Sequence, residues 1–184
     1  QLGFKPKNHK LNLKPWIDLQ KKIKKRKHKV KIAVVGKYTN LKDSYKSLNE
    51  ALVHGGIENS ADVNIQWINS EKENSISLMK KLKGCDGILI PGGFGIRGIN
   101  GKINAIKYAR ENNIPFFGIC LGMQLAVIEI AQNVLKIKNA HSSEFKKTTK
   151  SVVGLMTEWV NKNKIEKRDK NSNKGGTMRL GAYK

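Results

Sequence analysis

Short apolar segments alternate with amphipathic segments along the middle of this chain, and this alternation restricts the fold more than any other feature. Four runs rich in Val, Ile and Leu end at glycine or polar residues, and apolar residues at helical spacing fill the intervals. The predicted strands cover 30–35, 63–68, 86–90 and 114–119, and the predicted helices cover 44–53, 75–83, 103–112 and 124–134. This order favours a mainly parallel sheet with helices on both faces. The sequence therefore predicts an α/β fold of three layers, α/β/α.

Local signals set the limits and faces of these helices. The pair Gly55-Gly56 reads as a stop signal for the helix 44–53. Ile76, Met79 and Leu82 recur every third residue, with Leu78 beside them, and we expect them to be the apolar face of the helix 75–83. A short helix is expected to start at 16–19, and an extended segment is expected at 152–156.

The net charge of +22 lies mainly on the two flanks of the chain. Residues 1–31 hold 12 basic and 1 acidic residue, and residues 145–184 hold 11 basic and 3 acidic, whereas 32–144 is nearly balanced with 13 and 10. We interpret 1–28 as a basic interdomain linker and 161–174 as a disordered Lys/Asn-rich insertion in a domain that covers 29–184. Nucleic-acid binding is the less favoured alternative, because the flanks have few aromatic residues and no binding motif.

The compartment follows from what the sequence contains. No apolar run approaches the length of about 20 residues that a membrane helix needs, and the first residues do not resemble a signal peptide. Two cysteines, Cys85 and Cys120, do not suggest a disulfide framework, so we expect a reducing, cytoplasmic setting and no membrane. The chain lacks an initiator Met, and we expect it to be part of a longer protein.

Cys120 stands in the segment with the strongest chemical signal. The predicted strand 114–119 leads into Gly118-Ile119-Cys120-Leu121-Gly122, and a predicted helix follows. A cysteine with glycine two residues before and two after it, at a strand-to-helix turn, is typical of a nucleophile elbow. The helix N-terminus would lower the thiol pKa, and the Leu121 N–H would donate to an oxyanion. For Cys85 we favour a buried structural role.

A second glycine-rich turn follows the predicted strand 86–90. It reads Pro91-Gly92-Gly93-Phe94-Gly95 and continues to Gly98. Glycines at the end of a strand allow a ligand to approach the backbone closely, although the signal is weak alone. Since the strands are parallel, their carboxyl ends share one edge of the sheet, and this turn is expected to supply a second oxyanion donor.

These two turns together resemble the class I glutamine amidotransferases. Further segments resemble the CTP synthase family within that class, and the resemblance covers roughly 30–145 and 175–183. The segments are 35–38, 50–52 with 54–56, 93–95 with 97–98, 118–126, 140–145 and 176–181. Residues 1–28 resemble the linker before the amidotransferase domain of that family.

The resemblance implies roles for individual residues. Cys120 would attack the glutamine amide and form a thioester, while the N–H groups of Gly93 and Leu121 would stabilise the oxyanion. Arg97 and Arg179 resemble positions near the interface with the synthase domain, where GTP activates the glutaminase. The implied glutamine-binding residues are Gly93, Phe94, Leu121, Gly122, Met123, Gln124 and Glu144.

The same resemblance implies what this segment lacks. The family's general base His and its orienting Glu come after the 176–181 motif, so we assign none of His9, His28, His54 and His141 as the base. We expect no cofactor and no metal in this domain. ATP and Mg²⁺ would be bound by the synthase domain, and the tetramer contacts would lie mainly there. The domain is therefore expected to be truncated at its C-terminus and inactive alone.

Two other functions stay open. One is a catalytically silent amidotransferase-like module that serves in binding or assembly, which the retained Cys120 disfavours. The other is a different cysteine-elbow α/β hydrolase, which the 176–181 motif and the turn at Phe94-Gly95 disfavour.

Overall fold

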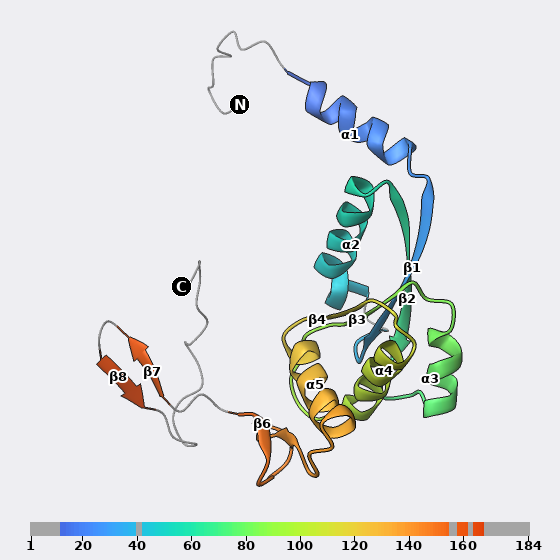
Figure 1. Ribbon diagram of the computed structural model, residues 1–184. Helices are drawn as coiled ribbons and strands as arrows, with labels where there is room; N and C mark the ends of the chain where they lie inside the picture. Colours follow the sequence, from blue (N-terminus) through green and yellow to red (C-terminus); the bar gives the residue numbers. More distant parts are fainter. Residues whose placement is uncertain (1–11, 40–41, 155–157, 162–163, 168–184) are drawn as a thin grey trace.

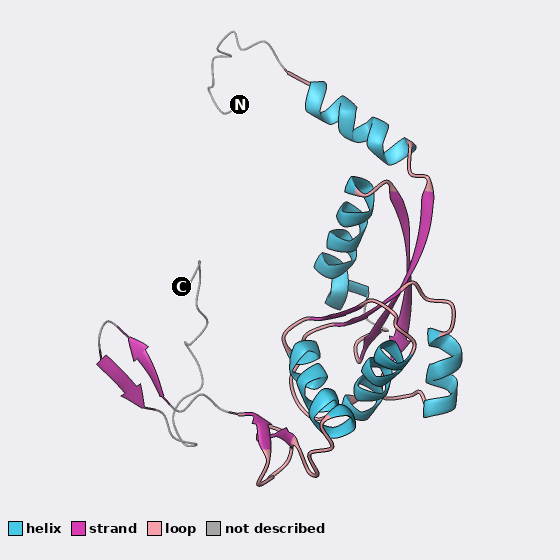
Figure 2. Ribbon diagram, viewed as in Figure 1, coloured by secondary structure: helices cyan, strands magenta, loops and turns pink. Residues whose placement is uncertain are grey.

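A computed structural model describes residues 12–39, 42–154, 158–161 and 164–167. Four parallel strands form the central sheet in the order β2-β1-β3-β4. They are β1 (His28–Gly36), β2 (Ala61–Asn69), β3 (Gly87–Ile90) and β4 (Phe116–Gly118). All four strands predicted from the sequence are present, and Figure 2 shows them between the helices. Because β2 and β3 flank β1 on opposite sides, the strand order reverses between β1 and β3, where parallel sheets place their ligands.

The helices that follow the strands agree largely with the predicted ones. They are α2 (Lys46–Glu58), α3 (Ser75–Leu82), α4 (Ile99–Glu111) and α5 (Leu121–Glu129), which a π-helical turn (Ile130–Val134) extends. A 3₁₀ turn (Lys42–Tyr45) precedes α2. The helix predicted at 124–134 thus begins three residues earlier, directly after Cys120. The α/β prediction with a parallel sheet is confirmed.

One apolar cluster joins the sheet to α3, α4 and α5. It includes Val35 and Ile90 from the strands, and Leu82, Ile106 and Leu125 from the three helices. The cluster takes no residue from α2, which packs on β2 and lies on the other side of the sheet (Figure 1).

An ion pair between a partly exposed arginine and a buried glutamate ties α4 to α5. Arg110 donates to the carboxylate of Glu129 at 2.7 Å, and Glu129 is 0% exposed. This carboxylate raises the pKa of the Arg110 guanidinium. The helix that follows the Cys120 elbow is therefore held by charge as well as by apolar packing.

Gly55-Gly56 does not stop α2, so that prediction is wrong. The helix continues to Glu58, and Gly56 is its one buried residue. A Cβ on Gly56 would lie 2.6 Å from Val63 Cγ2 and 2.8 Å from the Ala61 carbonyl oxygen. The glycine allows the helix to approach β2 closely, which is a packing requirement that local sequence does not reveal.

The predicted apolar face of α3 is also partly wrong. Leu78 and Leu82, four residues apart, are 1% and 0% exposed, whereas Ile76 and Met79 are 69% and 49% exposed. Residues four apart lie on one face of a helix, and here the face with the two leucines packs into the apolar cluster.

The basic N-terminal segment contains α1 (Lys14–Lys24), which is longer than the short helix expected at 16–19. It has no buried residue, and Lys22 pairs with Glu58 of α2 at 2.7 Å. No helix in the described part of the chain has the length and apolarity to cross a membrane.

After α5 the chain forms two small sheets. The short strands β5 (His141–Ser142) and β6 (Ser151–Val153) pair in parallel, and β6 overlaps the extended segment expected at 152–156 only at 152–153. Residues 155–157 lie outside the described residues. The antiparallel hairpin β7 (Glu158–Asn161) and β8 (Lys164–Lys167) falls where a disordered insertion was expected. For 161 and 164–167 that expectation is wrong, because Trp159, Val160 and Ile165 are residue types that favour strands. The remainder of 161–174 lies outside the described residues.

Candidate functional site

Cys120 lies at a sharp turn between β4 and α5. Its backbone has φ 50° and ψ −104°, a conformation that non-glycine residues rarely adopt. The residue is exposed, whereas Leu121, which follows it, is 2% exposed. The predicted elbow is therefore present, with its cysteine at the carboxyl edge of the sheet.

The two glycines around Cys120 are required by close backbone packing. A Cβ on Gly118 would lie 2.5 Å from the Gly122 carbonyl carbon, and a Cβ on Gly122 would overlap the Ile90 carbonyl oxygen. The turn closes through the Gly122 N–H, which donates to the Ile119 carbonyl at 2.9 Å. Any side chain at either position would push the elbow off β3 or open the turn, which explains the Gly-x-Cys-x-Gly spacing.

The start of α5 faces the same edge as Cys120. Cys120 is the N-cap residue, and its carbonyl accepts the Gln124 N–H at 3.1 Å. The first-turn N–H groups of a helix have no partner within the helix and carry partial positive charge. The Leu121 N–H belongs to this first turn, so it is available for an anionic oxygen next to the thiol.

The turn after β3 lies against this elbow. A Cβ on Gly92 would lie 3.5 Å from Cys120 Cβ, and one on Gly93 would lie 3.8 Å from Leu121 Cδ2. The structure therefore brings together Cys120, Leu121 and Gly93, which the sequence placed in one site.

Other predicted site residues lie around these three. Phe94 and Met123 are 82% and 57% exposed, and Gln124 is partly buried in the first turn of α5. Glu144 follows β5 and is exposed, with its N–H donating to Ser142 Oγ at 3.2 Å. Among the described residues no hydrogen bond or ion pair joins the Glu144 side chain to the elbow, and Arg179 lies outside them.

Arg97 belongs to a charged cluster beside the β3 turn. Its guanidinium is 3.4 Å from Glu71, which follows β2, and 6.0 Å from the ring centre of Tyr38. Lys37 Nζ also lies over this ring, 5.1 Å from its centre. Arg97 thus lies beside residues that follow β1 and β2, next to the turn that contacts the elbow.

Lys37 and Lys102 are two buried lysines to which the sequence reasoning gave no role. Lys37 is 8% exposed and donates to the Phe94 carbonyl, and Lys102 of α4 is 0% exposed with no hydrogen-bond partner for Nζ among the described residues. Burial, with the charge of Lys37, lowers the pKa of Lys102 to about 8. A helical count could have found Lys102, since it lies on the stripe of Ile99, Ile103 and Ile106.

Cys85 is buried, whereas Cys120 is exposed. It is 7% exposed, and its Sγ lies 3.6 Å from the Lys81 carbonyl oxygen. Burial raises the pKa of its thiol, which favours the unreactive protonated form.

Three histidines, His28, His54 and His141, belong to the described residues. His54 is exposed on α2, and His28 begins β1. His141 stacks edge-on against Phe145, with 6.2 Å between ring centres. No hydrogen bond joins any of them to Cys120 in the part of the chain that the structure describes, and His9 lies outside it.

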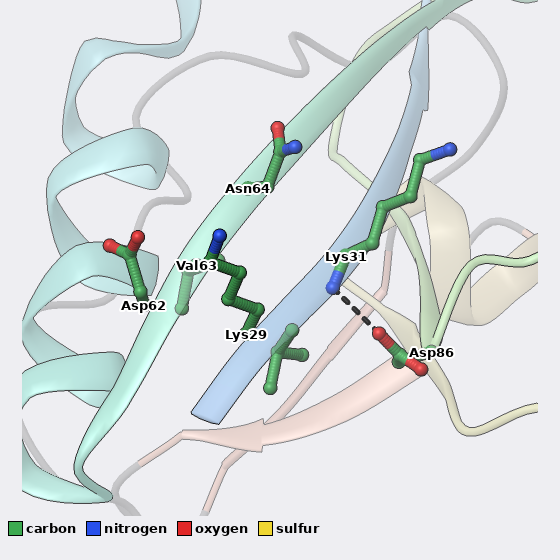
Figure 3. A pocket seen from close by; sticks show the side chains of 7 residues that line it. Lys29, Lys31, Asp62, Val63, Asn64 and Asp86 are labelled. Atoms are coloured by element: carbon green, nitrogen blue, oxygen red, sulfur yellow. Dashed lines mark hydrogen bonds between the residues drawn. The ribbon is translucent and has the colours of Figure 1, made fainter. Parts of the chain in front are cut away.

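A pocket of about 390 Å³ opens at the other half of the long strands, at Lys29, Lys31, Asp62 and Asn64. Figure 3 shows lysine side chains of β1 beside Asp62 and Asn64 of β2, with the Lys31 N–H bound to the Asp86 carboxylate at 2.8 Å. These residues belong to the amino-terminal halves of the strands, away from Cys120. No cluster of metal-binding side chains occurs among the described residues.

Three comparisons with known proteins bear on this site. The family described as glutamine amidotransferase class-I matches residues 40–184. The chain is 54% identical over 178 residues to a CTP synthase of Bartonella henselae, covering 95% of this chain and 32% of that protein. It is 53% identical over 175 residues to a CTP synthase of Nitratidesulfovibrio vulgaris, covering 94% and 32%.

A solved structure resembles the fold described above. It is the glutaminase domain of the Trypanosoma brucei CTPS with bound acivicin, with a TM-score of 0.65 and 45% identity. The match covers 69% of this chain and 50% of that one. The chain spans about 32% of the length of the curated relatives that it matches.

Proposed function

The chain belongs to the class I glutamine amidotransferase family, and we propose that it forms the glutaminase part of a CTP synthase. The observation that carries the proposal is the strained elbow at Cys120, packed against Gly92-Gly93. The similarity to CTP synthases over 95% of the chain supports it.

The proposed reaction begins with attack of the Cys120 sulfur on the amide carbon of glutamine. The N–H groups of Gly93 and Leu121 stabilise the negative charge that develops on the amide oxygen. The amide nitrogen then takes up the proton that the general base removed from the thiol, the C–N bond breaks, ammonia leaves and a glutamyl thioester remains. Attack by water on the thioester releases glutamate and restores the thiol.

Residues near the elbow would hold the amino-acid end of the substrate. We assign this role to Phe94, Gly122, Met123, Gln124 and Glu144, in addition to Gly93 and Leu121. Exposure of Phe94, Met123 and Glu144 agrees with a site open to solvent.

The proton transfers need a general base, which must take the thiol proton, protonate the leaving ammonia and activate water. We infer that a His and a Glu outside residues 1–184 supply it. His54 is exposed on α2 and His141 stacks edge-on against Phe145, and neither forms a hydrogen bond with Cys120 among the described residues, which supports this inference.

In the whole protein, the ammonia would aminate UTP to CTP in pyrimidine nucleotide biosynthesis. ATP and Mg²⁺ would act in a synthase domain of the same chain, with GTP as activator and Arg97 and Arg179 near the interface. The basic segment 1–28, which includes α1 and ends where β1 begins, would be the linker to that domain. We further propose a cytoplasmic homotetramer.

Acivicin, which the trypanosome structure contains, provides a direct test. The full-length protein is treated with acivicin or a diazo-ketone analogue of glutamine, and the label is located by peptide mapping. We expect it on Cys120, with loss of labelling and of glutamate release in Cys120→Ser, and with both retained in Cys85→Ser. Labelling of Cys85 would contradict the assignment, and absence of both labelling and glutamine hydrolysis would favour a silent module.

A further inference from the structure

Lys37 is a buried cation that donates a hydrogen bond to the turn at 92–95, beside the elbow. It directly follows β1, is 8% exposed, and donates from Nζ to the Phe94 carbonyl oxygen. Its Cε lies 3.7 Å from the position that a Cβ on Gly93 would take. No carboxylate pairs with it in the described part of the chain. A buried ammonium is costly unless it is bound, so this contact is strongly favoured in the folded state.

The turn at 92–95 packs against the elbow through Gly92 and Gly93, and in the described part of the chain its hydrogen bond to another segment is the one from Lys37. Gly92, Gly93 and Gly95 restrict the backbone dihedral angles less than other residues would. Gly95 has φ +77°, with open space where a Cβ would be. Phe94 and Ile96 are 82% and 65% exposed, so their side chains anchor the turn weakly. The direction of the Gly93 N–H therefore depends on a polar contact from another element.

We propose that Lys37 is a positioning residue for glutamine hydrolysis, which holds the turn at 92–95 so that the Gly93 N–H points at the oxyanion formed beside Cys120. The inference rests on the proposed function of the site. The Phe94 carbonyl belongs to the peptide group that joins residues 94 and 95, whereas the Gly93 N–H belongs to the group that joins 92 and 93. Lys37 therefore restrains the donor through the short backbone segment between them, and its side chain also lies against Gly93, with Cε 3.7 Å from the position of a Cβ there. Misplacing an oxyanion donor by about 1 Å can cost about 100-fold in rate.

Lys102 provides a matched control for this inference. It is also a fully buried lysine, close enough to Lys37 for their charges to interact. Its Nζ has no hydrogen-bond partner among the described residues, so it does not hold the turn. Lys102→Met removes a buried ammonium from the same region without removing the Phe94 contact.

The test uses the full-length protein and compares wild type with Lys37→Met, Lys37→Arg and Lys102→Met. We expect Lys37→Met to lower kcat for glutamine about 10- to 100-fold with KM within about threefold, since the oxyanion exists only in the transition state. Lys37→Arg, which can still donate to Phe94, should recover most of this loss. Lys102→Met should stay within about threefold of wild type. Alkylation of Cys120 by iodoacetamide should proceed within about twofold of the wild-type rate in all variants, because the elbow itself is unchanged.

Two results would overturn the inference: a kcat of Lys37→Met within threefold of wild type, or a loss confined to KM. Should Lys37→Met fail to fold, Lys37→Leu is measured with the same thresholds, because it too has no donor for the Phe94 carbonyl. Failure of the wild type to hydrolyse glutamine would refute the proposed function instead. Normal wild-type turnover with an unaffected Lys37 variant would refute the positioning role alone.

Discussion

The turn after β4 and the turn after β3 both contain several glycines, yet those glycines are surrounded very differently. In the first, Gly118 and Gly122 have backbone atoms where a Cβ would be, so the turn is fixed by its own packing on β3. In the second, Gly95 has open space around it, and Lys37, directly after β1, holds the adjacent Phe94 carbonyl. The first turn is specified by steric contacts of its glycines, whereas the second packs more loosely and has, among the described residues, one hydrogen bond to another segment.

This difference predicts opposite tolerance to added side chains, and Gly122→Ala is the variant with the largest expected effect. The new methyl group would overlap the Ile90 carbonyl oxygen, which belongs to the central sheet and cannot move away cheaply. We expect glutamine hydrolysis to fall by more than about 100-fold, because the elbow and the Leu121 N–H shift together. Steady-state glutamate release by the full-length variant measures this.

Gly95→Ala is the matched change in the other turn. It meets no atom, and its cost is the left-handed backbone at φ +77°, which is about 1 kcal/mol for a non-glycine residue. Its activity should stay within about tenfold of wild type. Equal losses in Gly95→Ala and Gly122→Ala would show that the two turns do not differ in the way proposed.

Lys102 allows the two buried lysines of this region to be compared. It is buried in the first turn of α4, and its charge interacts with that of Lys37. Its pKa of about 8 lies below the ordinary value of 10.5 because burial disfavours the charged form. Below pH 8 the folded state carries the whole cost of the buried ammonium. Between pH 8 and 10.5 the unfolded chain binds more protons than the folded one, so stability should rise with pH, by on the order of 3 kcal/mol.

Lys102→Met should therefore stabilise the protein at pH 7, by up to about 3 kcal/mol, and less at pH 10. Urea denaturation of wild type and variant at both pH values gives the difference, in which the other titrating groups cancel. Lys107→Met, an exposed change on the same helix, should alter the free energy of unfolding by less than about 0.5 kcal/mol. A destabilised Lys102→Met at pH 7 would mean that this ammonium has a stabilising partner.

The features that the sequence predicted are those that local spacing determines. The strands and the elbow at Cys120 follow from residues within about ten positions of one another, since side-chain alternation and glycine placement are local properties. The role of Gly56, the buried face of α3 and the contact from Lys37 to Phe94 depend on segments that only the fold brings together. Lys37 stood in a segment noted for its resemblance, but nothing in the spacing indicated that its side chain turns inward.

The smallest expected effect extends the same distinction to a helix outside the site. Gly55 and Gly56 are adjacent in α2, but a Cβ on Gly55 meets nothing within 4 Å, whereas one on Gly56 would lie 2.6 Å from Val63 Cγ2. Alanine is favoured over glycine in a helix, so Gly55→Ala should stabilise the protein by about 0.5–1 kcal/mol. Gly56→Ala should destabilise it by about 1–3 kcal/mol, because α2 must move off β2. Thermal unfolding of the two variants beside wild type tests this, and the sign of the shift is decisive. If both variants were stabilised, open space and close packing around a glycine would not predict its tolerance in this protein, and the contrast drawn between the two turns would lose its physical basis.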